Sequence, residues 1–110
     1  MKNSLRWILP FIIFPLAGLC ASSQEHWESL CAKCHGANGN GKTKEGVKLR
    51  IKDYTDPKVQ AEFTDTGLLK NLLLGVSTEA GVERMPHYKD KLTIDEAKDL
   101  VALIRGFKAK

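Results

Sequence analysis

This chain of 110 residues is poor in several residue types and patterns. It contains only two methionines and three cysteines, and it shows no internal repeat and no low-complexity tract. No segment alternates apolar and polar residues with the period of two that indicates a β-strand. The length allows one domain, and these absences favour an all-α architecture.

Long apolar runs are also absent, except for one near the N-terminus. It reads WILPFIIFPLAGLCA, follows Lys2 and Arg6, and leads into the polar segment SSQEHWE. A basic start, an apolar middle and a small-residue exit are typical of a secretory signal peptide. A membrane-spanning helix needs roughly 20 apolar residues. This run is shorter, and Pro10 and Pro15 interrupt it.

We therefore predict a signal peptide over residues 1–21, with cleavage between Cys20 and Ser23, and one domain over residues 22–110. An uncleaved N-terminal anchor is an alternative. A lipid anchor on Cys20 is another, but the residues before Cys20 fit a lipoprotein signal poorly.

The exported domain would be small and nearly neutral. Its 17 basic residues less Lys2 and Arg6, against 13 acidic ones, give a formal charge of +2. That charge is too low to indicate nucleic-acid binding. A domain of this size buries a small core and often depends on a disulfide, a metal or a cofactor.

Helix signals are clear in four places. Ser22 or Ser23 can cap a helix over SSQEHWESLCAKC, and Asp56 with Pro57 opens one in TDPKVQAEF. A third is expected from Asp65 to Leu74, ended by Gly75, and TIDEAKDLVALIRGF opens with the capping box of Thr93 and Glu96. Loops are expected between the first two helices, over residues 36–54, and between the last two, in STEAGVERMPHYKDK.

The stretch LCAKCHGANGNGKTK contains a Cys-x-x-Cys-His motif formed by Cys31, Cys34 and His35. A dithiol redox enzyme would place such a pair at the start of a helix that follows a strand, and no strand is expected here. A zinc site would need a second pair of ligands, for which only His26, on an exposed part of its helix, and His87 remain. A simple disulfide between the two cysteines is a further alternative.

Covalent haem attachment explains the whole motif best. Two thiols three residues apart can each add to one of two neighbouring vinyl groups of the macrocycle. The residue directly after the second thiol then lies beneath the iron, where His35 can present its imidazole. The glycines that follow allow the backbone to turn close to the ring edge.

The sixth position of the iron decides what such a site can do. Met85, in ERMPHYKDKL, is the only methionine outside the predicted signal, and Pro86 fixes the chain directly after it. A thioether is a soft, neutral ligand that favours ferrous iron. Met85 could instead fill the core, and His87 is the competing ligand, which would give a bis-histidine site of lower potential.

Together these motifs resemble the class I monohaem c-type cytochromes, of the short soluble bacterial type. The resemblance runs from about Ser22 to Phe107 and rests on WESLCAKCHG, RMPHYKDKLT and DEAKDLVALIRGF. It implies an all-α fold in which the N- and C-terminal helices cross and shorter helices and loops wrap one covalently bound haem c with its iron. His35 and Met85 would be the axial ligands.

The resemblance also implies particular contacts. Trp27 would pack at the helix crossing against Leu100 and Leu103, although the second position is commonly aromatic in the family. The second ring nitrogen of His35 would donate to a backbone carbonyl, expected within residues 44–52 because no proline occurs between His35 and Pro57.

The predicted function is a soluble periplasmic electron carrier that is not an enzyme, works by one-electron transfer, and meets its redox donor and acceptor proteins transiently. Alternatives are a haem domain or subunit of a larger redox complex, and an open-site peroxidase or gas sensor if Met85 is not a ligand. We expect no membrane span in the mature form. The basic segment from Lys42 to Lys52 is either a solvated loop or a docking patch for an acidic partner.

Overall fold

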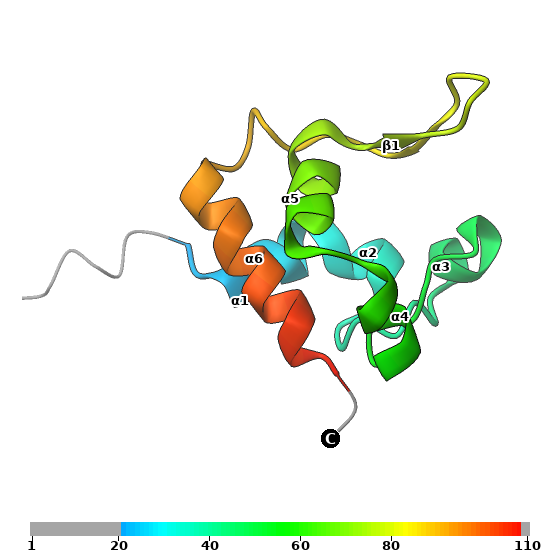
Figure 1. Cartoon of the computed structure of the whole chain (residues 1–110), viewed down its shortest axis with the longest axis horizontal. Coiled ribbons are helices and arrows are strands. Elements are labelled where there is room, and N and C mark those ends of the chain that lie inside the picture. The colour runs from blue at the N-terminus through cyan, green and yellow to red at the C-terminus, as the bar shows by residue number, and fades with distance from the viewer. Residues whose placement is uncertain (1–20, 109–110) are drawn as a thin grey trace, which may run out of the picture.

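The computed structural model describes residues 21–108, which form a helical fold with one short hairpin (Figure 1). The predicted signal peptide lies outside these residues, except for Ala21. The elements in chain order are α1 (Ser23–His26), the π-helical turn η2 (Trp27–Cys31), α2 (Ala32–His35), α3 (Lys44–Leu49), α4 (Pro57–Glu62), α5 (Asp65–Leu74), β1 (Val76–Ser77), β2 (Glu83–Met85) and α6 (Ile94–Gly106).

The N-terminal helix is continuous from Ser23 to His35 but widens in its middle. The Ser22 side chain accepts a hydrogen bond from the Glu25 backbone N–H and caps the helix as predicted. In η2 the N–H of Ala32 reaches back five residues to the carbonyl of Trp27. A turn of this width is rare in helices and is frequent at functional sites.

The other predicted helix boundaries are confirmed by their caps. Asp56 accepts from the N–H of Lys58 at the start of α4, and α5 ends at Gly75, whose φ of 77° is strained for residues with a side chain. Thr93 and Glu96 form both hydrogen bonds of the capping box at the start of α6. These signals were readable because each depends on residues only a few positions apart.

Two segments that were predicted to be loops contain regular structure. Within residues 36–54, helix α3 begins at a cap in which Thr43 accepts from the N–H of Gly46. The Thr43 hydroxyl also donates to the Cys34 carbonyl at 2.6 Å. A Cβ on Gly46 would lie 2.2 Å from the Gly41 carbonyl oxygen, so the helix packs closely on the preceding loop. This tertiary packing stabilises a helix that its lysine-rich sequence did not indicate.

The second correction concerns STEAGVERMPHYKDK, where β1 and β2 pair antiparallel. Val76 faces Met85 and Ser77 faces Glu83, with an irregularity between them. Strands of two and three residues are too short to show an alternating pattern, so no strand could be predicted from the sequence. The hairpin extends away from the helices (Figure 1).

The core lies where α6 packs against α1 and α5, and the N- and C-terminal helices cross there as expected (Figure 1). Trp27 and Leu100 are fully buried in this core, at 1% and 0% exposure. Leu103 is only partly buried. The aromatic partner of Trp27 is instead Phe107, whose ring centroid lies 4.8 Å from that of Trp27.

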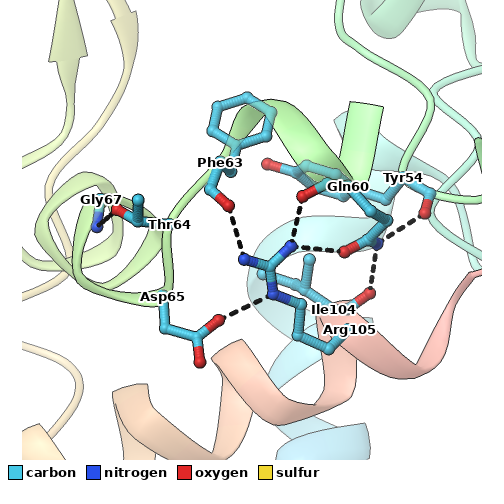
Figure 2. A network of polar contacts seen from close by, with 8 residues as sticks. All are labelled: Tyr54, Gln60, Phe63, Thr64, Asp65, Gly67, Ile104 and Arg105. Carbon is cyan, nitrogen blue, oxygen red and sulfur yellow. Dashed lines mark hydrogen bonds and ion pairs between the residues drawn. The ribbon is translucent and has the colours of Figure 1, made fainter. Parts of the chain in front are cut away.

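A polar network ties α6 to the segment around α4 (Figure 2). The Arg105 guanidinium donates to the carbonyls of Gln60 and Phe63, each at 2.6 Å, and to the Asp65 carboxylate at 2.7 Å. The buried Gln60 side chain in turn donates to the Tyr54 carbonyl at 2.7 Å. The network therefore fixes Tyr54, which lies in the wall of the site described next.

Candidate haem site

Cys31, Cys34, His35 and Met85 all line one cavity. The cavity is open on one side, and its empty space is about 970 Å³ when the part open to solvent is included. Most of the remaining wall is apolar and comes from segments spread over residues 30–88. The apolar wall residues include Leu30, Leu49, Ile51, Phe63 and Val76.

Both cysteines are free thiols. Cys31 is buried, and burial, with a smaller contribution from neighbouring Cys34, raises the pKa of its thiol to about 12. The thiol is therefore protonated at neutral pH. A buried neutral thiol of this kind lacks the activated thiolate of a dithiol redox enzyme, which sits in an electropositive environment.

The His35 imidazole is held between two aromatic rings. The Tyr54 ring stacks on it at a centroid distance of 5.4 Å and an interplanar angle of 11°, and Trp27 lies at 5.6 Å. Burial lowers the pKa of His35 to about 4, so the ring is neutral at pH 7. A neutral imidazole is the form that binds a metal.

The expected acceptor for a His35 ring nitrogen within residues 44–52 is not found. Nδ1 of His35 is buried and makes no hydrogen bond with the described residues. An unpaired buried polar atom costs about 1–3 kcal/mol, so its occurrence in a native structure calls for an explanation. A site that binds a further group to this ring is one such explanation.

Hydrogen bonds and close contacts hold the backbone at the end of the motif and in the loop that follows it. The Trp27 indole N–H donates to the Gly36 carbonyl at 2.9 Å, and the N–H of Gly41 donates to the His35 carbonyl at 2.8 Å. Gly39 packs against the ring of Phe107, where a Cβ would approach within 2.6 Å. Gly39 therefore allows this loop to pack closely against Phe107 at the end of α6.

Met85 reaches the cavity from the end of β2, where it is half-buried and packs against the core. His87, the competing ligand, is exposed and is not part of the cavity wall. Its Nε2 lies 3.4 Å from a carboxylate oxygen of Asp90. The structure thus brings Met85, and not His87, into the same cavity as His35.

His26, the remaining histidine, was predicted to be exposed, and this prediction is wrong. Only 13% of its side chain is accessible, and its Nε2 lies 3.4 Å from the Glu96 carboxylate at the start of α6. It therefore joins the two crossing helices at a distance from the cavity wall. Within residues 21–108, no three His, Cys, Asp or Glu side chains are grouped so that they could hold a metal ion.

Among the residues of the cavity that were not identified from the sequence are two tyrosines and an arginine. Tyr54 and Tyr88 line it with partly buried phenols, and burial is the main cause that raises the pKa of each. Arg84 also lines it, and its guanidinium donates to the Leu49 carbonyl, which links the hairpin to the end of α3. Their spacing in the sequence forms no motif, so no local signal could have indicated them.

The residues present fit a haem. Two free thiols, a neutral imidazole and a thioether lie around one largely apolar cavity. Arg50, Lys52 and Arg84 add positive charge to the wall, which suits the carboxylates that haem carries. Fold and site together define a monohaem c-type cytochrome.

Comparison with known proteins agrees with this class. Residues 19–104 match the family model described as "Cytochrome C oxidase, cbb3-type, subunit III", so the chain belongs to this family. Its cofactor is accordingly covalently bound haem c with iron, and it takes part in haem-based electron transfer.

Two solved structures are similar over nearly their whole length. One is the KustC0563 c-type cytochrome, with 32% identity and a TM-score of 0.68, covering 80% of this chain and 99% of that one. The other is a Tyr-to-Phe mutant of Kustc0563, also 32% identical, with a TM-score of 0.66, covering 80% of this chain and 100% of that one. A comparison with curated proteins gave no match.

Proposed function

We propose that the protein is a soluble, exported electron carrier whose haem iron is bound axially by His35 and Met85. The observation that carries this proposal is the position of Met85. It is the only methionine among the described residues, and its side chain lies in the wall of the cavity that also contains His35, Cys31 and Cys34. A carrier with both axial positions filled transfers electrons without binding a substrate, and is not an enzyme.

Each residue has a distinct role in this proposal. Cys31 and Cys34 attach the haem through thioether bonds, and His35 offers the neutral ring that a ligand requires. When bound, the haem iron supplies the one-electron ferric–ferrous chemistry. The apolar wall excludes water, and the neutral thioether of Met85 favours the ferrous state, which raises the reduction potential.

The experiment that tests axial ligation compares Met85→Ala with His87→Ala. Met85→Ala should retain covalent haem but lose the methionine-sulfur band of the ferric spectrum, its potential should fall, and it should bind cyanide or carbon monoxide readily. His87→Ala should change little. If His87→Ala shifts the spectrum and Met85→Ala does not, the site is bis-histidine and the carrier has a low potential.

Export is part of the proposal because haem attachment of this kind takes place outside the bacterial cytoplasm. We assign residues 1–21 to a signal peptide and residues 22–110 to the cytochrome domain. Within residues 21–108, no helix is long and apolar enough to cross a membrane. N-terminal sequencing of the protein from a periplasmic extract should give a start between Cys20 and Ser23, and a start at Met1 would contradict cleavage.

The transient redox partner is proposed to carry an acidic surface. Residues 33–52 contain many basic side chains and a single acidic one, Glu45, whereas acidic residues predominate in the rest of the described chain. Arg50 and Lys52 lie at the cavity itself. The basic residues of this proposed docking surface are Lys33, Lys42, Lys44, Lys48, Arg50 and Lys52. Docking through this surface should slow as salt concentration rises, because screening weakens the steering of charged proteins.

The family description also favours a second candidate, a subunit of a larger oxidase complex. The two candidates differ in how the protein is recovered from cells. A free carrier should appear in the periplasmic fraction at the size of a monomer. A permanent subunit should instead remain with the solubilised membrane fraction and copurify with oxidase activity.

A further inference from the structure

The segment from Gly75 to Tyr88 carries Met85 on its returning strand. It leaves the end of α5 at Gly75, runs out through the hairpin that projects from the helices, and returns through Met85 (Figure 1). Between Ser77 and Glu83 all of its residues are exposed. Within β2, the Arg84 guanidinium donates to the Leu49 carbonyl at the end of α3. The other contacts that hold Met85 in place lie at the base of the hairpin.

Tyr88 is the fixed point on the returning side. Its backbone N–H donates to the Leu72 carbonyl in α5 at 3.0 Å. Its phenol O–H donates to the Leu30 carbonyl in the N-terminal helix, also at 3.0 Å. One residue thus bonds two helices that come from different parts of the chain, and it does so three positions after Met85.

The acceptor of the Tyr88 phenol has a particular location. Leu30 belongs to the widened turn η2 and directly precedes Cys31. Insertion of a side chain into the hydrogen-bond ladder of a helix is one recognised cause of such distortions. The Tyr88 hydrogen bond therefore connects the segment of Met85 to the turn that presents the first haem cysteine.

Gly75 holds the same segment from the opposite side. A Cβ on Gly75 would lie 2.6 Å from the Met85 carbonyl oxygen and 2.9 Å from the His87 nitrogen. No side chain fits there, so the outgoing backbone packs directly on the returning one. Pro86 further restricts the backbone between Met85 and Tyr88.

We propose that Tyr88 is a positioning residue for Met85: its phenol, bonded to the Leu30 carbonyl, keeps the thioether over the site held by Cys31 and His35. The inference rests on the proposed function, in which Met85 is an axial ligand. A neutral thioether ligand is easily displaced. How fully Met85 occupies the axial position therefore depends on how much conformational entropy its segment loses on binding. Positioning by the surrounding structure lowers that entropic cost.

The test is Tyr88→Phe, which removes the hydroxyl and keeps the ring, so that the fold is retained. Cyanide competes with Met85 for the same axial position, and weaker positioning of Met85 should favour it. Loss of one hydrogen bond should raise the cyanide affinity of the ferric holoprotein about fivefold. The methionine-sulfur band should weaken in parallel. Gly75→Ala should change both readouts in the same direction, because it displaces the same segment.

Thr43→Val is the matched control. It also removes a hydroxyl that donates to a carbonyl of the motif, that of Cys34, but Thr43 makes no hydrogen bond to the Met85 segment. Cyanide affinity should stay at the wild-type value in this variant. Tyr88 has no positioning role if Tyr88→Phe binds cyanide with the wild-type affinity. The same conclusion follows if Tyr88→Phe and Thr43→Val raise the cyanide affinity by the same factor.

Met85→Ala separates failure of this inference from failure of the proposed function. If Met85→Ala loses the sulfur band while Tyr88→Phe behaves as the wild type, ligation by Met85 stands and the role of Tyr88 is wrong. If Met85→Ala keeps the wild-type spectrum, the ligation itself is wrong and the inference falls with it.

Discussion

The two sides of the molecule are built differently. On the helical side, where α1, α5 and α6 meet, the side chains are apolar and closely packed, and most of the core residues lie there. The cavity side consists of residues 36–56 and 75–91. Every buried residue between positions 36 and 56 is a glycine. Between positions 75 and 91, at the hairpin and the turn after it, no residue is buried.

This difference shows which part of the fold buries an apolar core of its own. The helical side buries apolar surface within the chain, which is the main favourable contribution to folding. The cavity side is held by backbone hydrogen bonds and close glycine contacts, which contribute less. A haem in the cavity would supply the apolar core that this side lacks. The following predictions test this contrast, from the largest expected effect to the smallest.

The largest effect should come from removing both attachment points. In cells able to mature c-type cytochromes, the wild-type chain should have the mass of the processed polypeptide plus one haem, retained in denaturant. With Cys31→Ala and Cys34→Ala together, the haem should be lost and the chain should be largely unfolded by circular dichroism. A double variant that stays fully folded would contradict the dependence of the cavity side on the cofactor.

Trp27→Ala should have the next largest effect, because Trp27 is fully buried in the core of the helical side. The free energy of unfolding should fall by about 3–5 kcal/mol, measured by chemical denaturation of the holoprotein. Leu103→Ala is the control and should cost less, because Leu103 is only partly buried. A loss below about 1 kcal/mol for Trp27→Ala would show that the helix crossing is not the centre of stability.

Arg105→Ala should destabilise the junction between α6 and α4, because it leaves the carbonyls of Gln60 and Phe63 without their donor. We expect a loss of about 2–3 kcal/mol in the free energy of unfolding. Asp65→Ala removes only the exposed end of the same network and should cost less than about 1 kcal/mol. Equal losses would mean that the ion pair, and not the carbonyl contacts, stabilises this junction.

The smallest effect concerns the start of α6. Thr93→Ala should cost about 1 kcal/mol at neutral pH, because it removes the capping side chain.

The hydrogen bond from the Thr93 backbone N–H holds the pKa of Glu96 below its ordinary value of 4.5. The native state therefore binds fewer protons at Glu96 than the unfolded state does. The stability from this group is present above pH 4.5 and is lost as the pH falls through the lowered pKa.

Denaturation curves recorded across this acid range provide the measurement. Glu96→Gln is the control, since glutamine can also complete a capping box but does not titrate. The fall in stability with acid should be shallower in this variant than in the wild type. The same slope in both proteins would show that other carboxylates account for the pH dependence.

Much of the helical side was determined by the sequence alone. The boundaries of α4 and α5 and the capping box of α6 follow from residues close together in the chain. The burial of Trp27 was implied by the family resemblance. The class of cofactor was likewise readable, because the attachment motif of Cys31, Cys34 and His35 is contiguous. Such local patterns can be interpreted without the tertiary structure, because the residues that form them are close together in the chain.

The cavity side was decided by tertiary structure. Helix α3 depends on the Thr43 contact with the Cys34 carbonyl, and the hairpin depends on the close approach of Gly75 to Met85. The bonding of Tyr88 to Leu30 joins positions 58 residues apart. No propensity or spacing in the sequence encodes these contacts, because their energy exists only after the chain has brought distant backbone groups together.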